Sequence, residues 1–310
     1  MDPRLRKRLF SPALLLIVLP PLFWAGNFII GRAVHGTVPP MTLSLWRWVL
    51  AMFFILPFAW KSVRRDFPLY MANRWLVVRL SLTGVVAFNS LVYMGLHETT
   101  AANALLLNSF IPVLIALFGA MFFRERLGGL QAGGLLISCA GVVIIISHGD
   151  WHTLAALSFS HGDLIVFCAM VSFAFYTLWL RSVPSQIDRL GLMAVQIAVA
   201  FIFLIPLWLT EYARGIVAVW DTPSLLALLY LGIFPSVLAY LLFNHGVARF
   251  GAAQAGLSIH LIPVFGAILA VLFLHESLHA YHAAGMAAIL TGIWLAMKKR
   301  SGAVTESIAE

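Results

Sequence analysis

The most informative absence in this sequence is charge. Only 10% of its 310 residues are Asp, Glu, Lys or Arg, whereas 62% are hydrophobic, and the mean hydropathy is +0.95. A soluble domain carries about a quarter charged residues, so the charges here are too few to cover a water-soluble globule of this length. The sequence therefore predicts a polytopic membrane protein.

Other absences exclude further classes of protein. The two cysteines, Cys139 and Cys168, both lie in apolar stretches, which argues against an extracellular disulfide framework. The net charge of +8 comes from basic residues scattered between apolar runs, so it does not indicate a nucleic-acid surface. The chain has no G-x-x-x-x-G-K-[ST] loop for ATP. No cofactor is expected.

Ten apolar runs are long enough to cross a bilayer as helices. The first follows a basic start but has no small-residue cleavage site, so it is interpreted as an uncleaved span rather than a signal peptide. The predicted fold is all-α and integral to the membrane, with spans at residues 12–34, 41–60, 76–96, 101–122, 129–147, 162–181, 190–210, 223–245, 252–274 and 283–297.

The basic residues indicate the orientation of these spans. If the N-terminus is cytoplasmic, 17 of the 20 lysines and arginines fall at the cytoplasmic side, and only Arg214 falls in an outer loop. The positive-inside rule therefore places both termini in the cytoplasm. The predicted tails are residues 1–11 and 298–310, and residues 148–161 form an outer linker.

The two halves of the chain are related by a repeat. A shift of 151 residues aligns Ile111-Pro112-Val113 with Ile262-Pro263-Val264, and it aligns Glu125 and Leu127 with Glu276 and Leu278. The repeats, residues 12–147 and 162–297, carry five spans each. Because five is odd, the second repeat must enter the membrane upside down. Inverted repeats are typical of transporters, with the substrate site between them near the midplane.

These residues resemble a known family. The sequence has Trp24-Ala25-Gly26-Asn27 in the first span, Arg47 with Ala51 in the second, and in each repeat a Pro…Glu-x-Leu…Gly…Gly pattern. This combination resembles the EamA type of the drug/metabolite transporter superfamily, nearest to bacterial amino-acid and metabolite exporters of the YddG type.

The resemblance implies a transporter of the inner membrane, not an enzyme. It would export small metabolites, above all amino acids with aromatic ones included, by alternating access. Its partners would be a small-molecule substrate and the lipid bilayer, and a monomer and a homodimer both remain open. Because no Asp or Glu lies in the middle of a span, facilitated diffusion or exchange is favoured over ion coupling.

Polar side chains inside spans suggest where the substrate passes. Asn89 and Tyr93 are four residues apart in the third span, and Ser236, Tyr240 and Asn244 step by four in the eighth. Four-residue spacing places each set on one helix face, and the 151-residue shift aligns Asn89 with Tyr240. We predict two walls of one pathway; interhelical hydrogen bonding is the alternative.

Several residues of the other spans complete the predicted pathway. Asn27 aligns with Tyr176 under a shift of 149 residues, and Ser172 and Asn108 are further polar candidates. Trp24 lies in the middle of a span, unlike the tryptophans at span ends that an interfacial belt explains. It could stack on an apolar or aromatic substrate or pack in the core.

Two ionisable residues have two interpretations each. Arg47 lies about 9 Å inside the second span and could bind a substrate carboxylate or hold carbonyl groups at helix ends. The second, structural role is favoured. The repeat aligns Arg47 with Gln196. His260 in the ninth span aligns with Ser109 and could couple protons or contact substrate, although a packing role is favoured.

One motif suggests different chemistry. His275-Glu276-Ser277-Leu278-His279 matches the H-E-x-x-H pattern of zinc metalloproteases, with His282 as a conceivable third ligand. The equivalent segment of the first repeat, Arg124-Glu125-Arg126-Leu127-Gly128, keeps the Glu and Leu without the histidines. An intramembrane protease is therefore the disfavoured alternative.

Overall fold

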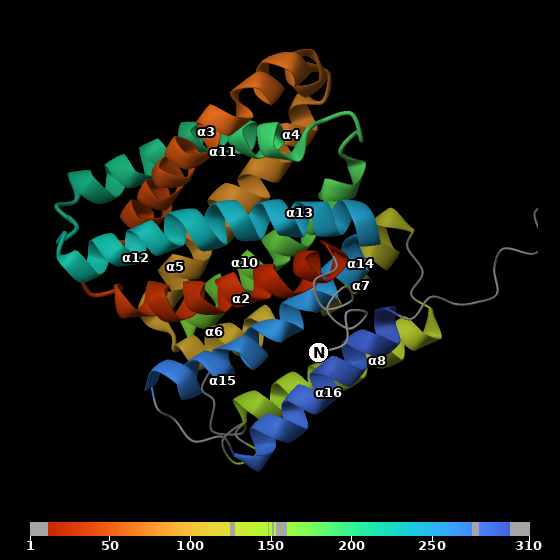
Figure 1. The fold of residues 1–310 in the computed structure, drawn as a ribbon. Coiled ribbons are helices and arrows are strands. Elements are labelled where there is room, and N and C mark those ends of the chain that lie inside the picture. Colours follow the sequence, from red (N-terminus) through yellow and green to blue (C-terminus); the bar gives the residue numbers. More distant parts are fainter. Residues whose placement is uncertain are drawn as a thin grey trace, which may run out of the picture.

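The computed structural model describes residues 12–124, 128–147, 149–150, 152, 160–274 and 279–297, and these residues are helical apart from short connections (Figure 1). Among the described residues, nine helical segments are long and apolar enough to cross a membrane, and the tenth predicted span is a shorter apolar helix, α8 (Gly129–Ile146). The long helices run side by side across the view of Figure 1. The predicted all-α fold of two five-span repeats is confirmed.

In the part of the first repeat that the structure describes there are eight helical elements. They are α2 (Pro12–Ala33), α3 (Pro40–Ala72), α4 (Arg74–Leu80), the π-helical η1 (Ser81–Ala87), α5 (Phe88–Glu98), α6 (Ala101–Asn108), α7 (Ile111–Phe123) and α8 (Gly129–Ile146).

The second repeat follows the same plan. It contains α10 (His161–Trp179), η2 (Leu180–Ser182), α11 (Arg189–Ala213), α12 (Thr222–Ile233), the π-helical η3 (Phe234–Leu238), α13 (Ala239–Phe250), α14 (Ala252–Leu257), η4 (Ser258–His260), α15 (Leu261–Leu274) and α16 (Ala280–Met297).

Capping residues fix where several helices begin. The side chains of Ser160, Asp188 and Asp221 each accept a hydrogen bond from the backbone N–H three residues later, as favoured N-caps do. α3 continues twelve residues beyond the predicted span end at residue 60. Its buried Asp66 accepts hydrogen bonds from the Arg65 side chain and from the Asp188 backbone N–H, so the extension is anchored to the start of α11.

Repeat-related residues touch one another along the middle of the molecule. The rings of Trp24 and Phe173 have centroids 5.5 Å apart, Asn89 Nδ2 lies 3.2 Å from the Tyr240 hydroxyl, and His260 Nε2 lies 2.9 Å from the Ser109 carbonyl oxygen. A residue that contacts its own repeat counterpart must lie beside the axis that relates the two halves. The inverted repeat therefore has its pseudo-twofold axis through these contacts.

Glycines hold the last helix of each repeat together. α8 packs along α16 at one edge of the bundle (Figure 1). A Cβ on Gly141 would come within 2.6 Å of the Gly285 carbonyl oxygen, and a Cβ on Gly134 would collide with the Gly292 carbonyl. Only glycine permits this close approach of two backbones.

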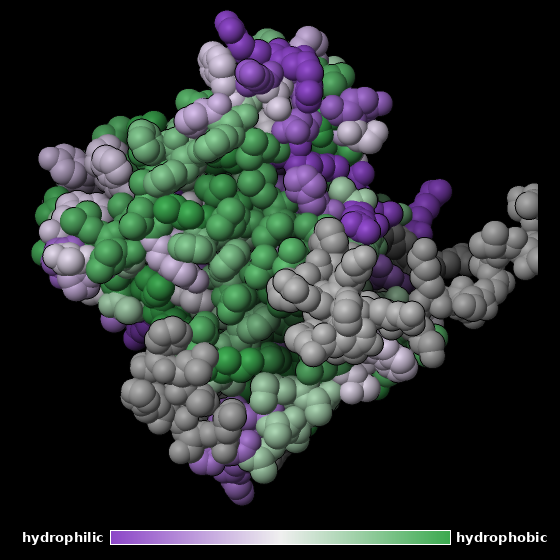
Figure 2. Space-filling model, in the orientation of Figure 1, coloured by the Kyte–Doolittle hydropathy of each residue, from purple (hydrophilic) through white to green (hydrophobic). Residues whose placement is uncertain are grey.

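The outer surface of the bundle is apolar. Figure 2 shows hydrophobic residues across the middle of the visible face, with polar residues gathered towards its margins. Phe58 on α3 is 75% exposed and Ile202 on α11 is 67% exposed. Trp60 and Trp294 are also exposed, as the predicted interfacial belt requires. This surface fits the hydrocarbon region of a bilayer.

Candidate functional site

The candidate site begins with a buried arginine on α3. Following the predicted orientation, we call the end of the bundle with residues 33–40, 98–101 and 213–222 the outer end and the opposite end the inner end. Arg47 lies in the outer half and is 1% exposed. Its Nε donates to Ser236 Oγ at 2.7 Å, and its Nη1 donates to Asn27 Oδ1 at 2.9 Å and to the Tyr93 hydroxyl. Tyr93 in turn donates to Asn27 Oδ1 at 2.9 Å. We call Asn27, Arg47, Tyr93 and Ser236 the outer cluster.

No carboxylate of the described residues pairs with the charge of Arg47. All its hydrogen-bond partners are neutral, and none of the carboxylates in the described residues lies within 4 Å of it. Its Nη2 donates no hydrogen bond to a described residue. An ionised group inside a membrane protein usually has an opposite charge as partner. The outer cluster can therefore accommodate an anion.

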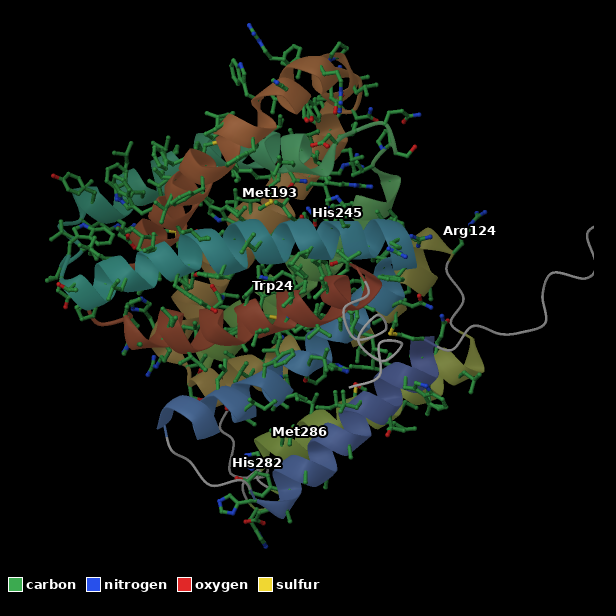
Figure 3. All side chains as sticks on the ribbon, viewed as in Figure 1. Trp24, Arg124, Met193, His245, His282 and Met286 are labelled. Atoms are coloured by element: carbon green, nitrogen blue, oxygen red, sulfur yellow. The ribbon has the colours of Figure 1, made fainter. Side chains whose placement is uncertain are left out.

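Aromatic side chains form a layer at the middle of the bundle. Trp24, on α2 at the centre of Figure 3, makes edge-on contacts with Phe173, Tyr240 and Phe243 at centroid distances of 5.5, 5.8 and 5.2 Å. Trp48 lies 5.4 Å from Tyr240, and its ring centroid is 5.3 Å from Arg47 Cζ. The indole N–H of Trp48 is buried and has no partner. The arginine thus borders an aromatic surface with a free donor.

Two π-helical turns lie at equivalent positions beside this layer. A shift of 151 residues carries residues 83–87 of η1 onto η3. The extra residue of a π turn exposes backbone carbonyls: Gly84 O accepts from the Tyr240 hydroxyl at 2.5 Å and from Asn89 Nδ2 at 3.2 Å, and Pro235 O accepts from Trp24 Nε1 at 3.2 Å. π turns occur often at functional sites.

The fourth and ninth spans are interrupted at the same depth. Pro112 and Pro263 lack an N–H, so the carbonyls of Asn108 and Ile259 lose their usual helical donor. Both of these residues line a cavity of about 10 Å³ together with Trp24 and Asn27. That volume holds about one water molecule. This conformation is therefore closed around the centre.

A second polar cluster lies in the inner half. The Tyr176 hydroxyl donates to Asn244 Oδ1 at 2.9 Å, which repeats the Tyr93–Asn27 bond with the residue types exchanged between the helices. Gln196, on α11, occupies the position that corresponds to Arg47 and is fully buried. By this repeat correspondence we group Gln196 with the Tyr176–Asn244 pair and call the three residues the inner cluster.

Most predicted pathway residues therefore meet at the centre. The aromatic layer or the small cavity is surrounded by the outer cluster, Trp24, Asn89, Asn108, Tyr176, Tyr240 and Asn244. Ser172 is different: it donates to Thr83 O at 2.9 Å and joins α10 to η1. Whether these residues carry substrate stays a prediction.

His260 lies apart from both clusters. Its Nε2 donates to the Ser109 carbonyl oxygen at 2.9 Å, and its Nδ1 is hydrogen-bonded to Ser138 Oγ at 2.5 Å. An imidazole with both ring nitrogens hydrogen-bonded inside the protein is compatible with the packing role that the sequence favours, and the role of His260 stays a prediction.

Two central residues escaped the sequence analysis. Trp48 was missed because it lies only two residues from Trp46 in an aromatic-rich span, and periodicity alone does not distinguish a core tryptophan. Gln196 was noticed only as the counterpart of Arg47. Its alignment with a buried charge was the signal that could have identified it.

The protease alternative gains no support. His275, Glu276, Ser277 and Leu278 lie outside the described residues, and the His279 ring stacks on Tyr281 and His282. Within the described part of the chain, no three His, Cys, Asp or Glu side chains come together as metal ligands would.

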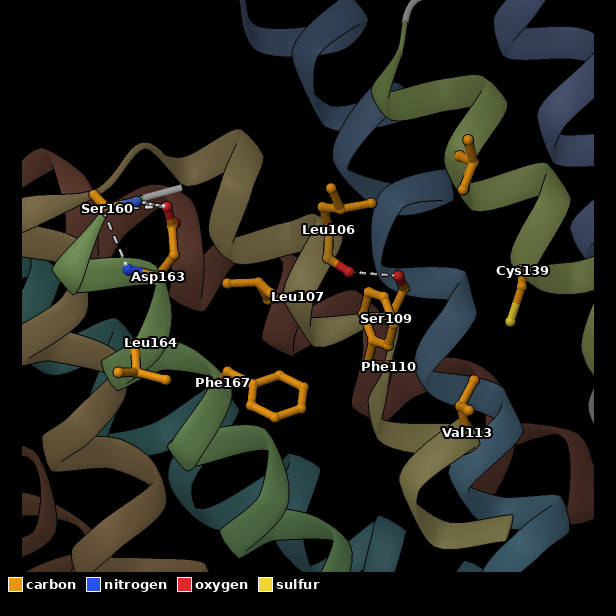
Figure 4. A pocket seen from close by; sticks show the side chains of 11 residues that line it. Leu106, Leu107, Ser109, Phe110, Val113, Cys139, Ser160, Asp163, Leu164 and Phe167 are labelled. Atoms are coloured by element: carbon orange, nitrogen blue, oxygen red, sulfur yellow. Dashed lines mark hydrogen bonds between the residues drawn. The ribbon is translucent and has the colours of Figure 1, made fainter. Parts of the chain in front are cut away.

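A larger cavity opens on the side of the bundle. It has a volume of about 580 Å³ and lies between α6, α7, α8 and α10, where Leu107, Phe110 and Phe167 line it (Figure 4). Phe110 and Leu164 at its edge are exposed. None of the predicted pathway residues lines this cavity, so it is distinct from the central site.

Comparison with known proteins identifies the relatives of this chain. The model of the EamA-like transporter family matches residues 11–147 and 160–298. An uncharacterized transporter of Archaeoglobus fulgidus is 29% identical over 92% of this chain and 97% of its own length. The uncharacterized transporter YyaM of Bacillus subtilis is 27% identical over 80% of this chain and 81% of its own.

A more distant relative and a solved structure also match this chain. A WAT1-related chloroplastic protein of Arabidopsis thaliana is 23% identical over 90% of this chain and 68% of its own length. A protein of known crystal structure, 22% identical, superimposes with a TM-score of 0.71 over 92% of this chain and 96% of that one.

Proposed function

The chain belongs to the EamA-like transporter family and is a multi-pass membrane transporter, and we propose that it carries small solutes with a carboxylate group, amino acids above all. In this proposal the solute crosses the centre of the bundle between the two repeats. The protein would lie in the inner membrane with both termini in the cytoplasm and would export its substrate.

The uncompensated charge of Arg47 carries this proposal. Among the described residues this guanidinium, which is 1% exposed, has only neutral partners and none at Nη2, so it is suited to a carboxylate. Trp48 offers a second unpartnered donor close to the guanidinium. A solute without negative charge would leave both donors poorly matched.

The aromatic layer is suited to a solute that carries an apolar or aromatic side chain. Trp24, Phe173 and Tyr240 lie directly beside the outer cluster. Aromatic rings stack favourably at the centroid separations observed here. L-Phenylalanine combines the carboxylate and the ring and is therefore our probe.

A difference between the two ends supports alternating access. At the inner end α14 packs on α7, so closely that a Cβ on Gly256 would come within 2.5 Å of Ile115 Cδ1. The equivalent pair at the outer end is α6 with α15, and in the described residues these two helices are not packed in a comparable way. Two states that exchange this packing would open the centre to one side at a time.

The acidic side chains favour facilitated diffusion or exchange. Glu211 is at the outer end of α11, where it accepts from the Met41 and Thr42 backbone N–H groups at 3.1 and 2.8 Å. Asp163 is in the first turn of α10 and accepts from the Ser160 N–H at 2.6 Å. Both carboxylates cap helices, and neither lies at the midplane where a proton or sodium relay would be needed.

Counterflow tests the proposed function. Purified protein is reconstituted into liposomes preloaded with unlabelled solute and assayed with labelled L-phenylalanine, other amino acids, nucleosides and sugars, with ionophores that collapse proton and sodium gradients. We expect saturable counterflow of amino acids that ionophores do not abolish. Counterflow of sugars or nucleosides alone would refute the carboxylate assignment.

A further inference from the structure

The inner cluster differs from the outer cluster in how its polar groups are used. The two clusters occupy equivalent positions in the inverted repeats, and each contains one Tyr–Asn hydrogen bond of 2.9 Å. In the outer cluster, Arg47 Nη1 donates to both members of this pair, to Asn27 Oδ1 and to the Tyr93 hydroxyl. In the inner cluster, Gln196 stands at the same position and makes no hydrogen bond.

Three polar atoms of the inner cluster are therefore buried without a partner. They are Gln196 Nε2, Gln196 Oε1 and Asn244 Nδ2, and both side chains are 0% exposed. Nearly all buried polar atoms in proteins are hydrogen-bonded, and each exception needs a physical explanation. Several unpartnered polar atoms in one cluster indicate a site that a polar ligand occupies for part of the time.

A cation extends this set of donors towards the inner end. Arg189 lies seven residues before Gln196 on α11, which places both on the same helix face. Arg189 Nη1 is buried and has no partner among the described residues. Its charge is available to whatever enters the inner cluster from the inner end.

The chemistry of these atoms selects the ligand. Three of the four unpartnered atoms, on Gln196, Asn244 and Arg189, are N–H donors, and one is an acceptor. An oxygen-rich anion satisfies several donors at once, and the single amide oxygen remains for an ammonium group. A zwitterionic amino acid offers both groups.

We infer that Gln196, Asn244 and Arg189 form a second carboxylate-binding station in the inner half, which receives the solute on the opposite side of the aromatic layer from Arg47. This inference rests on the proposed function. The two stations use different chemistry: the outer one holds a permanent charge, whereas the inner one uses amides beside a peripheral arginine. The inner station therefore binds more weakly and releases its solute more readily.

Sided transport kinetics test this inference. KM for labelled L-phenylalanine is measured in right-side-out and inside-out membrane vesicles for the wild type and for Gln196→Met, which removes both unpartnered amide atoms at similar volume. Loss of a hydrogen bond to a charged group corresponds to about a tenfold change in affinity. We expect KM at the inner face to rise about tenfold and KM at the outer face to change less than about twofold.

Two further variants make the result interpretable. Thr177→Val is the matched control: Thr177 is buried beside Tyr176, but its hydroxyl already donates to Phe173 O of its own helix at 2.9 Å. It should leave both KM values unchanged. Arg189→Gln provides a second test at another position should Gln196→Met not fold, as judged by thermal unfolding in detergent, and it should also raise KM at the inner face alone.

The outcomes separate the inference from the proposed function. If wild-type vesicles do not transport L-phenylalanine or any other carboxylate solute, the proposed function fails. If the wild type transports but Gln196→Met and Arg189→Gln keep KM at the inner face within about twofold, the inner cluster binds only water and the inference is wrong. An equal rise at both faces would indicate a single shared site and would also overturn it.

Discussion

Replacing Arg47 with glutamine removes the one charge of the outer cluster. Gln196 shows that the equivalent position of the second repeat accommodates a fully buried glutamine, so Arg47→Gln should fold. The variant loses the guanidinium but keeps a side chain able to hydrogen-bond with Ser236 or Tyr93. We therefore expect its thermal unfolding midpoint in detergent to stay close to that of the wild type.

The expected effect on transport follows from the free donor. Arg47 already uses Nε and Nη1 for Ser236, Asn27 and Tyr93, which leaves Nη2 for the solute. One charge-assisted hydrogen bond contributes about 2 kcal/mol, which corresponds to about a 30-fold change in affinity. KM for L-phenylalanine counterflow should rise about 30-fold in Arg47→Gln. Arg47→Lys keeps the charge without the planar fork and should lie between the two.

A matched arginine controls for the loss of positive charge. Arg32 lies at the outer end of α2, where Nη1 donates to the Leu96 carbonyl oxygen. Arg32→Gln should change KM less than about threefold. If Arg47→Gln instead transported with wild-type KM but unfolded at a much lower temperature, Arg47 would serve only to join the helices, as the structural interpretation of the sequence favoured.

Three further substitutions test other parts of the structure. Gly134→Ala should destabilise the protein by about 1–3 kcal/mol, because the added Cβ collides with the Gly292 carbonyl. The neighbouring Gly133 has open space around its Cβ position, so Gly133→Ala should stabilise the protein by about 0.5–1 kcal/mol. Equal shifts of the melting temperature in the two variants would refute the close packing of α8 on α16. His260→Gln should leave the pH dependence of counterflow unchanged, since a glutamine preserves a donor and an acceptor, and a pH profile that shifts would show a coupling role. Trp24→Leu should weaken transport of L-phenylalanine more than that of L-alanine, measured as the ratio of their kcat/KM values, and an unchanged ratio would remove the aromatic layer from substrate selection.

Much of the fold could be predicted, because the lengths of the hydrophobic runs identify the spans and the repeat alignment relates the two halves of the chain. Pro112 and Pro263 align under one shift, and the structure interrupts both spans beside these residues. The length of α3 was underestimated, since the segment after residue 60 is charged. Its helical extension depends on the contact of Asp66 with the start of α11, which only the folded chain brings together.

The site was harder to predict than the fold. Helix-face spacing placed Tyr93 and Asn89 on one face of the third span, but it could not show that Tyr93 bonds to Asn27 and Arg47 of other helices. The unpartnered state of Gln196 was also invisible to the sequence, because hydrogen-bond satisfaction depends on side-chain geometry across the bundle. Repeat alignment was the one sequence signal that connected these residues.

The central claim is that the middle of the bundle binds a solute carboxylate. Competition against L-phenylalanine counterflow tests it most directly, with 3-phenylpropionate, which lacks the amino group, and phenethylamine, which lacks the carboxylate, as competitors of equal ring size. The account predicts that 3-phenylpropionate competes in the wild type and loses this competition in Arg47→Gln, whereas phenethylamine does not compete. Competition by phenethylamine without competition by 3-phenylpropionate would contradict it.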